Sequence, residues 1–262
     1  MKENDKIKRT PFKKALLAVR ITVALAVLVL IVLSLYGFFF EPHWVRLKDI
    51  TVATNPGIKI IHITDIHYKG DRGYLESVVE TINSIQADYV CFTGDLVEEQ
   101  EYLEEVTEIL GEVKLPLIAI MGNHDHWTGM KVGSFKKYFE AHGQYFLEEE
   151  TLLLGDVAFH GVEEDSPEPS LVKDKLNILL CHYPAYADSL KNRFDLILAG
   201  HTHGGQLRIP FSGAISLPWG TAGYDMGLFE TPGGPMYVNP GIGTFWINFR
   251  FLCRPEITVI EI

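Results

Sequence analysis

The sequence is poor in cysteine, and this limits the kinds of site it can build. Its three cysteines, Cys91, Cys181 and Cys253, stand far apart along the chain. An odd number without close spacing argues against a disulfide framework and against a thiolate metal site. Because Cys91 and Cys181 lie within apolar runs, we expect them to be small buried core residues.

Several common catalytic motifs are also missing. The chain contains no G-x-S-x-G, no H-E-x-x-H and no G-x-x-x-x-G-K-[ST] string. This argues against a serine-hydrolase elbow, a zinc-protease helix and a nucleotide-binding P-loop. A basic surface is lacking too, since the formal net charge is -11. Nucleic-acid binding requires a positively charged face, so we expect no nucleic-acid partner.

Positive charge is concentrated at the N-terminus. Residues 1–20 hold seven Lys and Arg against two acidic residues, which leaves 16 basic and 32 acidic side chains in the rest of the 262-residue chain. Residues 21–40 contain no charged residue. As a helix rising about 1.5 Å per residue, they would cross the roughly 30 Å hydrocarbon core of a bilayer. We therefore predict a transmembrane helix over residues 21–40.

The flanks of this helix predict its orientation. Seven basic residues precede it, whereas only Arg46 and Lys48 follow soon after. The positive-inside rule makes residues 1–20 a cytoplasmic tail and places the rest of the chain outside the cytoplasm, in a single-pass protein of the cell membrane. A cleaved signal peptide is the alternative. The bulky end of the segment, Phe38-Phe39-Phe40, is more typical of a membrane interface than of a peptidase site.

Residues 50–262 have the length of a single domain, and no repeat or long linker divides them. Apolar runs predict strands at 58–64, 89–93 and 117–121, with amphipathic helices at 75–85 and 103–113 between them. This alternation indicates parallel strands with right-handed crossovers. The later predicted strands are 152–161 (as a hairpin), 177–181, 196–199, 236–239 and 257–262. The fold class is α/β, with two sheets packed face to face and helices outside.

Potential metal ligands follow the ends of several predicted strands. They are carboxylate, amide and imidazole groups: Asp65, His67, Asp95, Asn123, His182, His201 and His203. Because the carboxyl ends of parallel strands meet at one edge of a sheet, we expect these groups to converge. Gly94 and Gly122 precede two of them, and glycine lets backbone segments approach without a Cβ clash.

Seven such ligands exceed the ordinary coordination of one ion and suit two divalent cations that share a carboxylate. Two metals about 3.5–4 Å apart can hold a bridging hydroxide and neutralise a phosphoryl group. They also lower the pKa of bound water, so that it can attack near neutral pH. The ligand set accepts Mn²⁺, Fe²⁺ or Zn²⁺ and does not select among them. The sequence thus predicts a metal-dependent phosphohydrolase without a serine or cysteine nucleophile.

Five strings in fixed order resemble the signature of the calcineurin-like metallophosphoesterases. They are Asp65-Ile66-His67, Gly94-Asp95, Gly122-Asn123-His124-Asp125, His182 and Gly200-His201-Thr202-His203. The resemblance extends from about residue 57 to the end of the chain and implies a sandwich of two central β-sheets flanked by helices. The Gly204-Gly205-Gln206 extension and the Pro255-Glu256-Ile257 ending are similar to a membrane-associated or exported bacterial branch of that family.

The resemblance implies two overlapping ligand sets. One metal would be held by Asp65, His67, Asp95 and His203, and the other by Asp95, Asn123, His182 and His201, with Asp95 bridging. His124 would deliver a proton to the leaving oxygen, and Asp125 would orient the His124 imidazole. Many members of the family carry an arginine just before a Gly-Leu-Gly string near the C-terminus, where this chain has Asn239-Pro240-Gly241-Ile242-Gly243. A cation that clamps the substrate is therefore expected to be missing.

Other conspicuous residues have simpler interpretations. His62 and His160 lie in predicted strands and are expected to be packed wall residues, while His126 either lines the cleft or lies outside it. The acidic runs Glu98-Glu99 and Glu148-Glu149-Glu150 are expected to be solvated surface. The stretch 204–245 is rich in glycine, proline and aromatic residues, which is typical of a functional rim. Its aromatic residues, among them Trp219, either pin the loop or, facing a bilayer, hold an acyl chain.

We therefore predict a membrane-anchored, dinuclear metal-dependent phosphodiesterase that acts on phosphodiester or pyrophosphate linkages. One alternative is a specific pyrophosphohydrolase for a lipid-linked or nucleotide-sugar substrate, of the UDP-2,3-diacylglucosamine type. The alternative from another class is a non-catalytic, membrane-tethered metal-binding scaffold.

Overall fold

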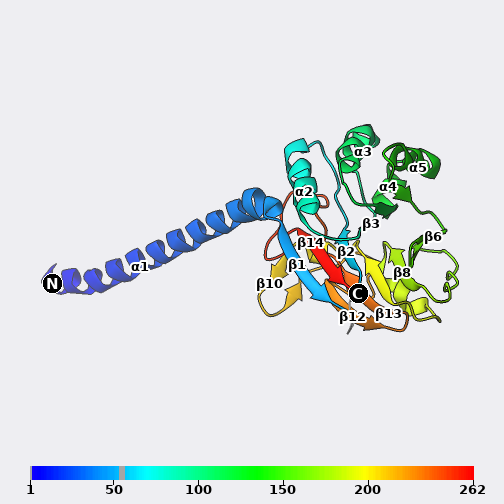
Figure 1. Ribbon diagram of the computed structural model, residues 1–262. Helices are drawn as coiled ribbons and strands as arrows, with labels where there is room; N and C mark the ends of the chain where they lie inside the picture. The colour runs from blue at the N-terminus through cyan, green and yellow to red at the C-terminus, as the bar shows by residue number, and fades with distance from the viewer. Residues whose placement is uncertain (1, 53–56) are drawn as a thin grey trace.

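A long helix projects from one side of an α/β body (Figure 1). The computed structural model describes residues 2–52 and 57–262, so Met1 of the predicted tail and residues 53–56 of the predicted body lie outside the described residues. Helix α1 (Lys2–Leu35) continues through a π-helical turn (Tyr36–Phe40) and a 3-10 turn (Glu41–His43). Within Lys13–His43, the most apolar stretch has a mean hydropathy of 2.9 and no residue buried against the body. This helix is a candidate membrane span, and it contains the predicted residues 21–40.

The first sheet has six strands in the order β1-β14-β2-β3-β4-β5. Their bounds are β1 (Arg46–Thr51), β14 (Glu256–Glu261), β2 (Lys59–Ile63), β3 (Tyr89–Thr93), β4 (Leu117–Ile120) and β5 (Tyr145–Phe146). Strands β2 to β5 are parallel, and β14 pairs with β2 in the antiparallel sense. The parallel pairing predicted from the strand-helix alternation is confirmed.

The second sheet also has six strands, in the order β12-β13-β9-β8-β7-β6. Their bounds are β12 (Gly227–Thr231), β13 (Gly234–Val238), β9 (Leu196–Ala199), β8 (Leu176–Cys181), β7 (Val157–Val162) and β6 (Thr151–Leu154). Strands β7, β8 and β9 are parallel, and β6 and β7 form the predicted hairpin. A separate short hairpin, β10 (Arg208–Ile209) with β11 (Gly213–Ala214), lies in the glycine-rich stretch.

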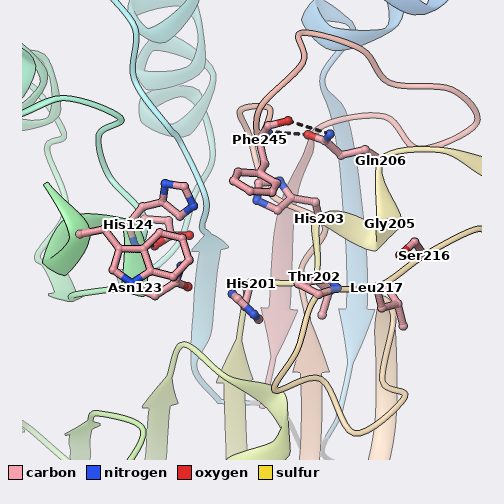
Figure 2. A pocket seen from close by; sticks show the side chains of 13 residues that line it. Asn123, His124, His201, Thr202, His203, Gly205, Gln206, Ser216, Leu217 and Phe245 are labelled. Atoms are coloured by element: carbon pink, nitrogen blue, oxygen red, sulfur yellow. Dashed lines mark hydrogen bonds between the residues drawn. The ribbon is translucent and has the colours of Figure 1, made fainter.

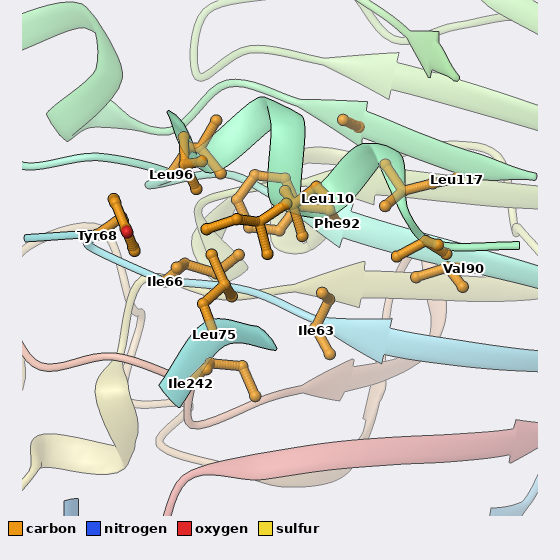
Figure 3. Close-up of a cluster of buried hydrophobic side chains, with 14 of the residues drawn as sticks. Ile63, Ile66, Tyr68, Leu75, Val90, Phe92, Leu96, Leu110, Leu117 and Ile242 are labelled. Atoms are coloured by element: carbon orange, nitrogen blue, oxygen red, sulfur yellow. The ribbon is translucent and has the colours of Figure 1, made fainter. Parts of the chain in front are cut away.

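Helices cover the outer face of the first sheet. They are α2 (Arg72–Ser84), α3 (Leu103–Gly111) and α5 (Val132–Ala141), and a short helix α4 (Asn123–Trp127) follows β4. Asp71 caps α2 by accepting a hydrogen bond from the Tyr74 amide at 3.2 Å, which satisfies one free N–H of the first turn. Leu75 of α2 and Leu110 of α3 pack with Phe92 of β3 in the cluster shown in Figure 3.

The two sheets share an apolar core. Ile60, Cys91 and Ile118 of the first sheet belong to one buried cluster with Phe159 and Leu198 of the second. Because both faces of the central strands are covered, their sequences are continuous apolar runs rather than alternating ones. The outer face of the second sheet differs from the expected helical layer. It is covered by the 3-10 segment Pro184–Ser189 and by loop side chains such as Leu190 and Phe194.

Strand β1 begins before residue 50, where we expected the body to start. It pairs in parallel with β14, and Arg46 forms an ion pair with the buried Glu256. Its sequence, RLKDIT, is half exposed and has only a weak apolar pattern. Such an edge strand is specified by its pairing partner, which is more than 200 residues away in the chain.

Removing the aromatic ring between the sheets should destabilise the body. Phe159 is fully buried, and its ring centroid lies 5.1 Å from that of Tyr89 on the facing sheet. Phe159→Ala should lower the free energy of unfolding by about 3–5 kcal/mol, because it leaves a cavity. Urea denaturation of the detergent-solubilised full chain measures the change. Leu153→Ala, at an exposed position of the same hairpin, is the control, and an equal loss in both variants would contradict the prediction.

Candidate metal centre

Five strand ends deliver the expected ligands to one place between the sheets. Asp65 and His67 follow β2, Asp95 follows β3, and Asn123 begins α4 directly after β4. From the other sheet, His182 follows β8, and His201 and His203 follow β9. Hydrogen bonds join the sheets here, among them that of His182 Nδ1 with the carbonyl of Thr93 at 2.8 Å and that of the His201 amide with Asp65 Oδ2 at 2.9 Å.

The first group of donor atoms comes from Asp65, His67, Asp95 and His203. One ligand atom from each lies within 4.8 Å of all the others. His67 Nε2 is 3.0 Å from His203 Nε2 and 3.4 Å from Asp95 Oδ2, and His203 Nε2 is 3.4 Å from Asp65 Oδ1. All four residues are buried. The structure therefore brings together the first of the two expected ligand sets.

The second group contains Asp95, His182 and His201, again within 4.8 Å of one another. His182 Nε2 lies 3.3 Å from Asp95 Oδ2 and 3.2 Å from His201 Nδ1. Asn123 Oδ1 is 3.0 Å from the same His182 nitrogen. Asp95 belongs to both groups, so the other six residues expected as ligands gather around its carboxylate.

The donor chemistry fits bound cations. The second ring nitrogens of two histidines are engaged outside the cluster: His182 Nδ1 with the Thr93 carbonyl, and His201 Nε2 with the Trp219 carbonyl at 2.7 Å. A carbonyl accepts only from a protonated nitrogen, so the other nitrogen of each neutral ring presents a lone pair inward. Two inward imidazole nitrogens 3.0 Å apart, those of His67 and His203, repel each other unless a proton or a cation lies between them.

Charge in the cluster is unbalanced without added cations. Burial lowers the pKa of His67, but the carboxylates of Asp95 and Glu98 outweigh it and raise that pKa to about 9. His182 behaves in the same way beside Asp95, and its pKa is also about 9. Burial raises the pKa of Asp95, yet the two imidazoles hold it well below its ordinary range. The buried carboxylates thus recruit protons onto imidazoles, which is the charge that divalent cations would replace.

The backbone at the ligands is strained. Five of the seven expected ligands have positive φ: Asp65 (50°), His67 (43°), Asp95 (58°), His201 (68°) and His203 (51°). Non-glycine residues in this region cost of the order of 1–3 kcal/mol each and cluster at functional sites. Gly94 is also left-handed, and a Cβ there would lie 2.5 Å from the backbone nitrogen of Gly122. The two glycines let adjacent strand ends pass in backbone contact.

We expected Asp125 to contact the His124 imidazole, but its carboxylate faces the backbone instead. Its carboxylate accepts backbone hydrogen bonds from Asp95 (2.9 Å), Leu96 (2.8 Å) and Gly122 (2.9 Å). Among the described residues, no hydrogen bond joins Asp125 to the ring of His124. Asp125 is fully buried and holds the loop that carries Asp95, because those amide groups have no other acceptor in the turn.

Glu98 occupies the position we had expected for Asp125, and our interpretation of Glu98 as solvated surface is wrong. Its Oε1 lies 2.8 Å from His67 Nδ1 and its Oε2 lies 3.6 Å from His124 Nδ1. Its side chain is only 21% exposed. The one sequence signal that could have found it is its position three residues after Asp95, on the same turn.

A cavity of about 260 Å³ opens beside the cluster. Figure 2 shows His124 and Asn123 on one wall, with Gln206, Ser216 and Leu217 opposite and Phe245 at the edge. Among the described lining residues there is no lysine or arginine. Neutralisation of a bound anion therefore depends on histidines and metal ions.

Asn239 and Arg250 both brace the loop at residues 240–243. The Asn239 side-chain carbonyl accepts the Gly241 amide at 2.7 Å, and its NH₂ group donates to the His62 carbonyl (3.0 Å) and to Thr258 Oγ1 (2.9 Å). Arg250 is fully buried, and its guanidinium donates to carbonyls of this loop, including that of Pro240 at 2.8 Å. The loop in turn packs on the backbone of Asp65. Neither residue faces the cavity, so neither clamps a substrate.

The remaining histidines mostly behave as expected. His62 pairs with Thr93 Oγ1 at 2.9 Å, and His160 pairs with Thr151 and Asn177, so both are packed wall residues. His126 lies outside the metal cluster, 3.3 Å from Glu163, in a neighbouring cavity of about 340 Å³. Cys91 and Cys181 are buried and unpaired, as expected for core residues, and Cys253 is buried and unpaired as well.

Comparison with known proteins gives consistent matches. Residues 58–205 match the family model described as calcineurin-like phosphoesterase. The uncharacterized metallophosphoesterase YkuE of Bacillus subtilis is 30% identical, over 87% of this chain and 88% of that protein. Phosphodiesterase YaeI of Escherichia coli is 25% identical, over 87% and 92%. A zebrafish transmembrane protein with metallophosphoesterase domain is 28% identical, over 90% of this chain and 61% of that protein.

Loss of the shared carboxylate should empty the cluster of metal. Asp95→Asn keeps the Oδ1 that accepts the His124 amide at 2.8 Å, so the fold should remain. The variant should fall from about two bound ions per chain to fewer than about one. Plasma mass spectrometry of protein purified with manganese gives the content. Asp188→Asn, at an exposed carboxylate bonded to Tyr224, should retain the ions, and a full metal load in Asp95→Asn would count against the cluster.

Proposed function

This chain belongs to the calcineurin-like phosphoesterase family and is a metal-dependent phosphoester hydrolase, and on that premise we propose that it is a membrane-anchored phosphodiesterase with two divalent cations. The observation that carries the proposal is that Asp95 belongs to both groups of buried ligands. The first cation would be held by Asp65, His67, Asp95 and His203, and the second by Asp95, Asn123, His182 and His201. When bound, two such cations would acidify a water molecule and neutralise the phosphoryl oxygens.

The protein's own residues would position the reaction. Carbonyl contacts of His182 and His201 fix which ring nitrogen faces the cluster. His124 lines the cavity, and its amide is tied to Asp95, so the imidazole is held next to the cluster. With Glu98 near its Nδ1, the Nε2 side of that ring is left to donate a proton to the departing oxygen. This role is the one expected for His124, and Glu98 takes the orienting role expected for Asp125.

Two features favour a diester over a monoester. The cavity lining has no lysine or arginine among its described residues, and a diester carries one negative charge where a monoester carries up to two. A second cavity, of about 340 Å³, borders Asn123, His182 and Trp127 on another side of the cluster. Two cavities give each of the two substituents of a diester a place to lie. The metal identity is left open among Mn²⁺, Fe²⁺ and Zn²⁺, because this ligand set suits all three.

Removal of the proton donor should affect poor leaving groups most. With Mn²⁺, the full chain in detergent should hydrolyse bis-(p-nitrophenyl) phosphate, whose leaving group is p-nitrophenolate, and also glycerophosphoethanolamine, a diester whose two possible leaving groups are both alkyl alcohols. His124→Ala should cut turnover of alkyl leaving groups by about 10²–10⁴-fold, with a smaller loss for p-nitrophenolate, which is a stabilised anion. Glu98→Gln should also slow alkyl leaving groups more than p-nitrophenolate, but by a smaller factor. Both variants should keep the metal content of the wild type.

Two controls sharpen this measurement. Glu99→Gln, at the adjacent exposed carboxylate, should leave both rates unchanged. Equal losses for both leaving groups would mean that His124 acts without proton donation. No turnover of any diester by metal-loaded wild type would leave the non-catalytic scaffold as the better account.

The direction of the anchor separates the remaining enzyme candidates. We infer from the basic tail that α1 spans the membrane with residues 1–20 in the cytoplasm and the body outside. A C-terminal alkaline phosphatase fusion in a bacterial host should then be active, and a C-terminal green fluorescent protein fusion should be dark. The opposite result would place the body in the cytoplasm. There it could meet nucleotide sugars, and the pyrophosphohydrolase candidate would be favoured.

A further inference from the structure

Exposed apolar side chains gather on two neighbouring segments of the body. One is the hairpin of β10 and β11, with Ile209, Phe211 and Ile215 exposed, and the other is the loop 245–252, with Trp246, Ile247 and Leu252 exposed. We call these six side chains the apolar rim. Phe211 is fully exposed at the hairpin turn, and Trp246 is 84% exposed. Single exposed apolar residues are ordinary, whereas a contiguous group of them marks an interaction surface.

The two segments form one surface. The amide of Arg208, at the start of the hairpin, donates to the Phe251 carbonyl at 3.0 Å. The amide of Phe251 donates to the Gln206 carbonyl at 2.9 Å. Hairpin and loop are therefore hydrogen bonded along their backbones and cannot move apart independently.

This surface is attached to the base of helix α1. The Arg250 amide donates to the Gly37 carbonyl at 2.9 Å, and the Phe249 ring packs on Phe38 with centroids 4.7 Å apart. Glu41 is fully buried, and its carboxylate accepts the amides of Leu252 and Cys253. A buried, hydrogen-bonded carboxylate at this junction fixes the angle between helix α1 and the body. The two are therefore not joined by a flexible linker.

The fixed angle keeps the apolar rim on the same side of the body as helix α1. In Figure 1 the β10–β11 hairpin lies on the side of the body from which α1 departs, and β6 lies on the far side. The apolar stretch of the helix runs into Phe38, Phe39 and Phe40, next to the loop of the rim. If α1 spans the bilayer, the rim lies at the depth where its hydrocarbon ends and its interface begins.

We propose that the apolar rim inserts into the bilayer interface and that the metal centre hydrolyses phosphodiester lipids held in that membrane. This inference rests on the proposed function and on α1 as a membrane span. Aromatic and aliphatic side chains are favoured at the interface, where apolar contact does not require charge. Charge attraction is not available here, because the chain beyond residue 20 has twice as many acidic as basic residues.

The cavity of the metal centre opens at the rim. Gly205 and Gln206 line it and lead into β10, while Ser216 and Leu217 line it just after β11. Phe245 lines its edge and is followed directly by Trp246 (Figure 2). The Gln206 side chain joins the two segments, since it donates to the Phe245 carbonyl at 3.0 Å and accepts the Phe245 amide at 2.6 Å. A lipid phosphate at the interface would reach the cluster with its acyl chains still in the bilayer.

The reaction is a hydrolysis that needs no further reactant. Water adds its oxygen to phosphorus, one P–O ester bond breaks, and the departing oxygen receives a proton. The products are a phosphomonoester and an alcohol. Either the headgroup alcohol or the diacylglycerol side can depart, depending on which substituent enters which cavity.

The depth of the rim can be measured with tryptophan fluorescence. The full chain, with Trp44, Trp127 and Trp219 replaced by Phe, is reconstituted in vesicles of equal phosphatidylglycerol and phosphatidylethanolamine, with or without bromine on the acyl chains. Brominated lipid should quench Trp246 by roughly half. The matched control replaces Trp246 as well and carries Leu153→Trp on β6, and it should not be quenched. An unquenched Trp246 overturns the proposal, and a cross-linked dimer in that case would assign the rim to a second copy.

Activity on two substrates separates this inference from the proposed function. Wild type should release headgroup alcohol or diacylglycerol from these vesicles and should also hydrolyse soluble bis-(p-nitrophenyl) phosphate. The double variant Phe211→Ser, Trp246→Ser should lose about tenfold or more of the lipid activity with soluble turnover unchanged, and Leu153→Ser should change neither. Soluble turnover without any lipid hydrolysis in wild type overturns the inference alone. Failure on both substrates overturns the proposed function, and an equal loss on both by the double variant assigns the rim a structural role only.

Discussion

The carboxylate of Asp95 lies between the imidazoles of His67 and His182, and the arrangement of the site depends on this contact. Burial penalises the carboxylate charge, yet the two rings hold its pKa well below the ordinary value. The surrounding backbone is organised to keep it there, because Asp125 accepts the amides of Asp95 and Leu96. A buried anion with so many fixed partners is stable only if positive charge is supplied, by protons on imidazole or by metal ions. Asp125 and Glu98 therefore support the cluster in different ways, Asp125 through the backbone amides and Glu98 through the rings of His67 and His124.

The sandwich supplies what local sequence cannot. Five expected ligands have left-handed backbone, a conformation that would relax in an isolated loop. The buried central strands of the two sheets hold these turns in place, since each turn directly follows a strand that is covered on both faces. Glycine at positions 94 and 122 permits the backbone contact between neighbouring strand ends. The strain is thus compensated by apolar burial in the core, and the ligand atoms are in position before any ion binds.

The same fold connects the metal cluster to the base of helix α1. Arg250 donates to the loop at residues 240–243, which packs on the Asp65 backbone, and its own amide bonds to Gly37 at the base of α1. Helix, rim and metal centre are consecutive parts of one hydrogen-bonded structure. An acidic body of this kind gains nothing from anionic surfaces, so in the proposed arrangement apolar contact and a fixed helix would be the physical means by which the body faces a bilayer.

The sequence by itself determined the fold class, the parallel strands, the candidate span and the seven residues that converge, because strand ends and helix spacing are written in local patterns. It could not determine the partners of Asp125 and Glu98. Both are acidic residues near a motif, and only the packed turn shows that one carboxylate faces backbone amides and the other faces two imidazoles. Strand β1 was equally inaccessible, since an edge strand has no periodic signal, and the composition of residues 204–245 indicated a functional rim without showing that the loop 245–252 joins it. Tertiary structure decided these features because they depend on contacts between segments that lie far apart in the chain.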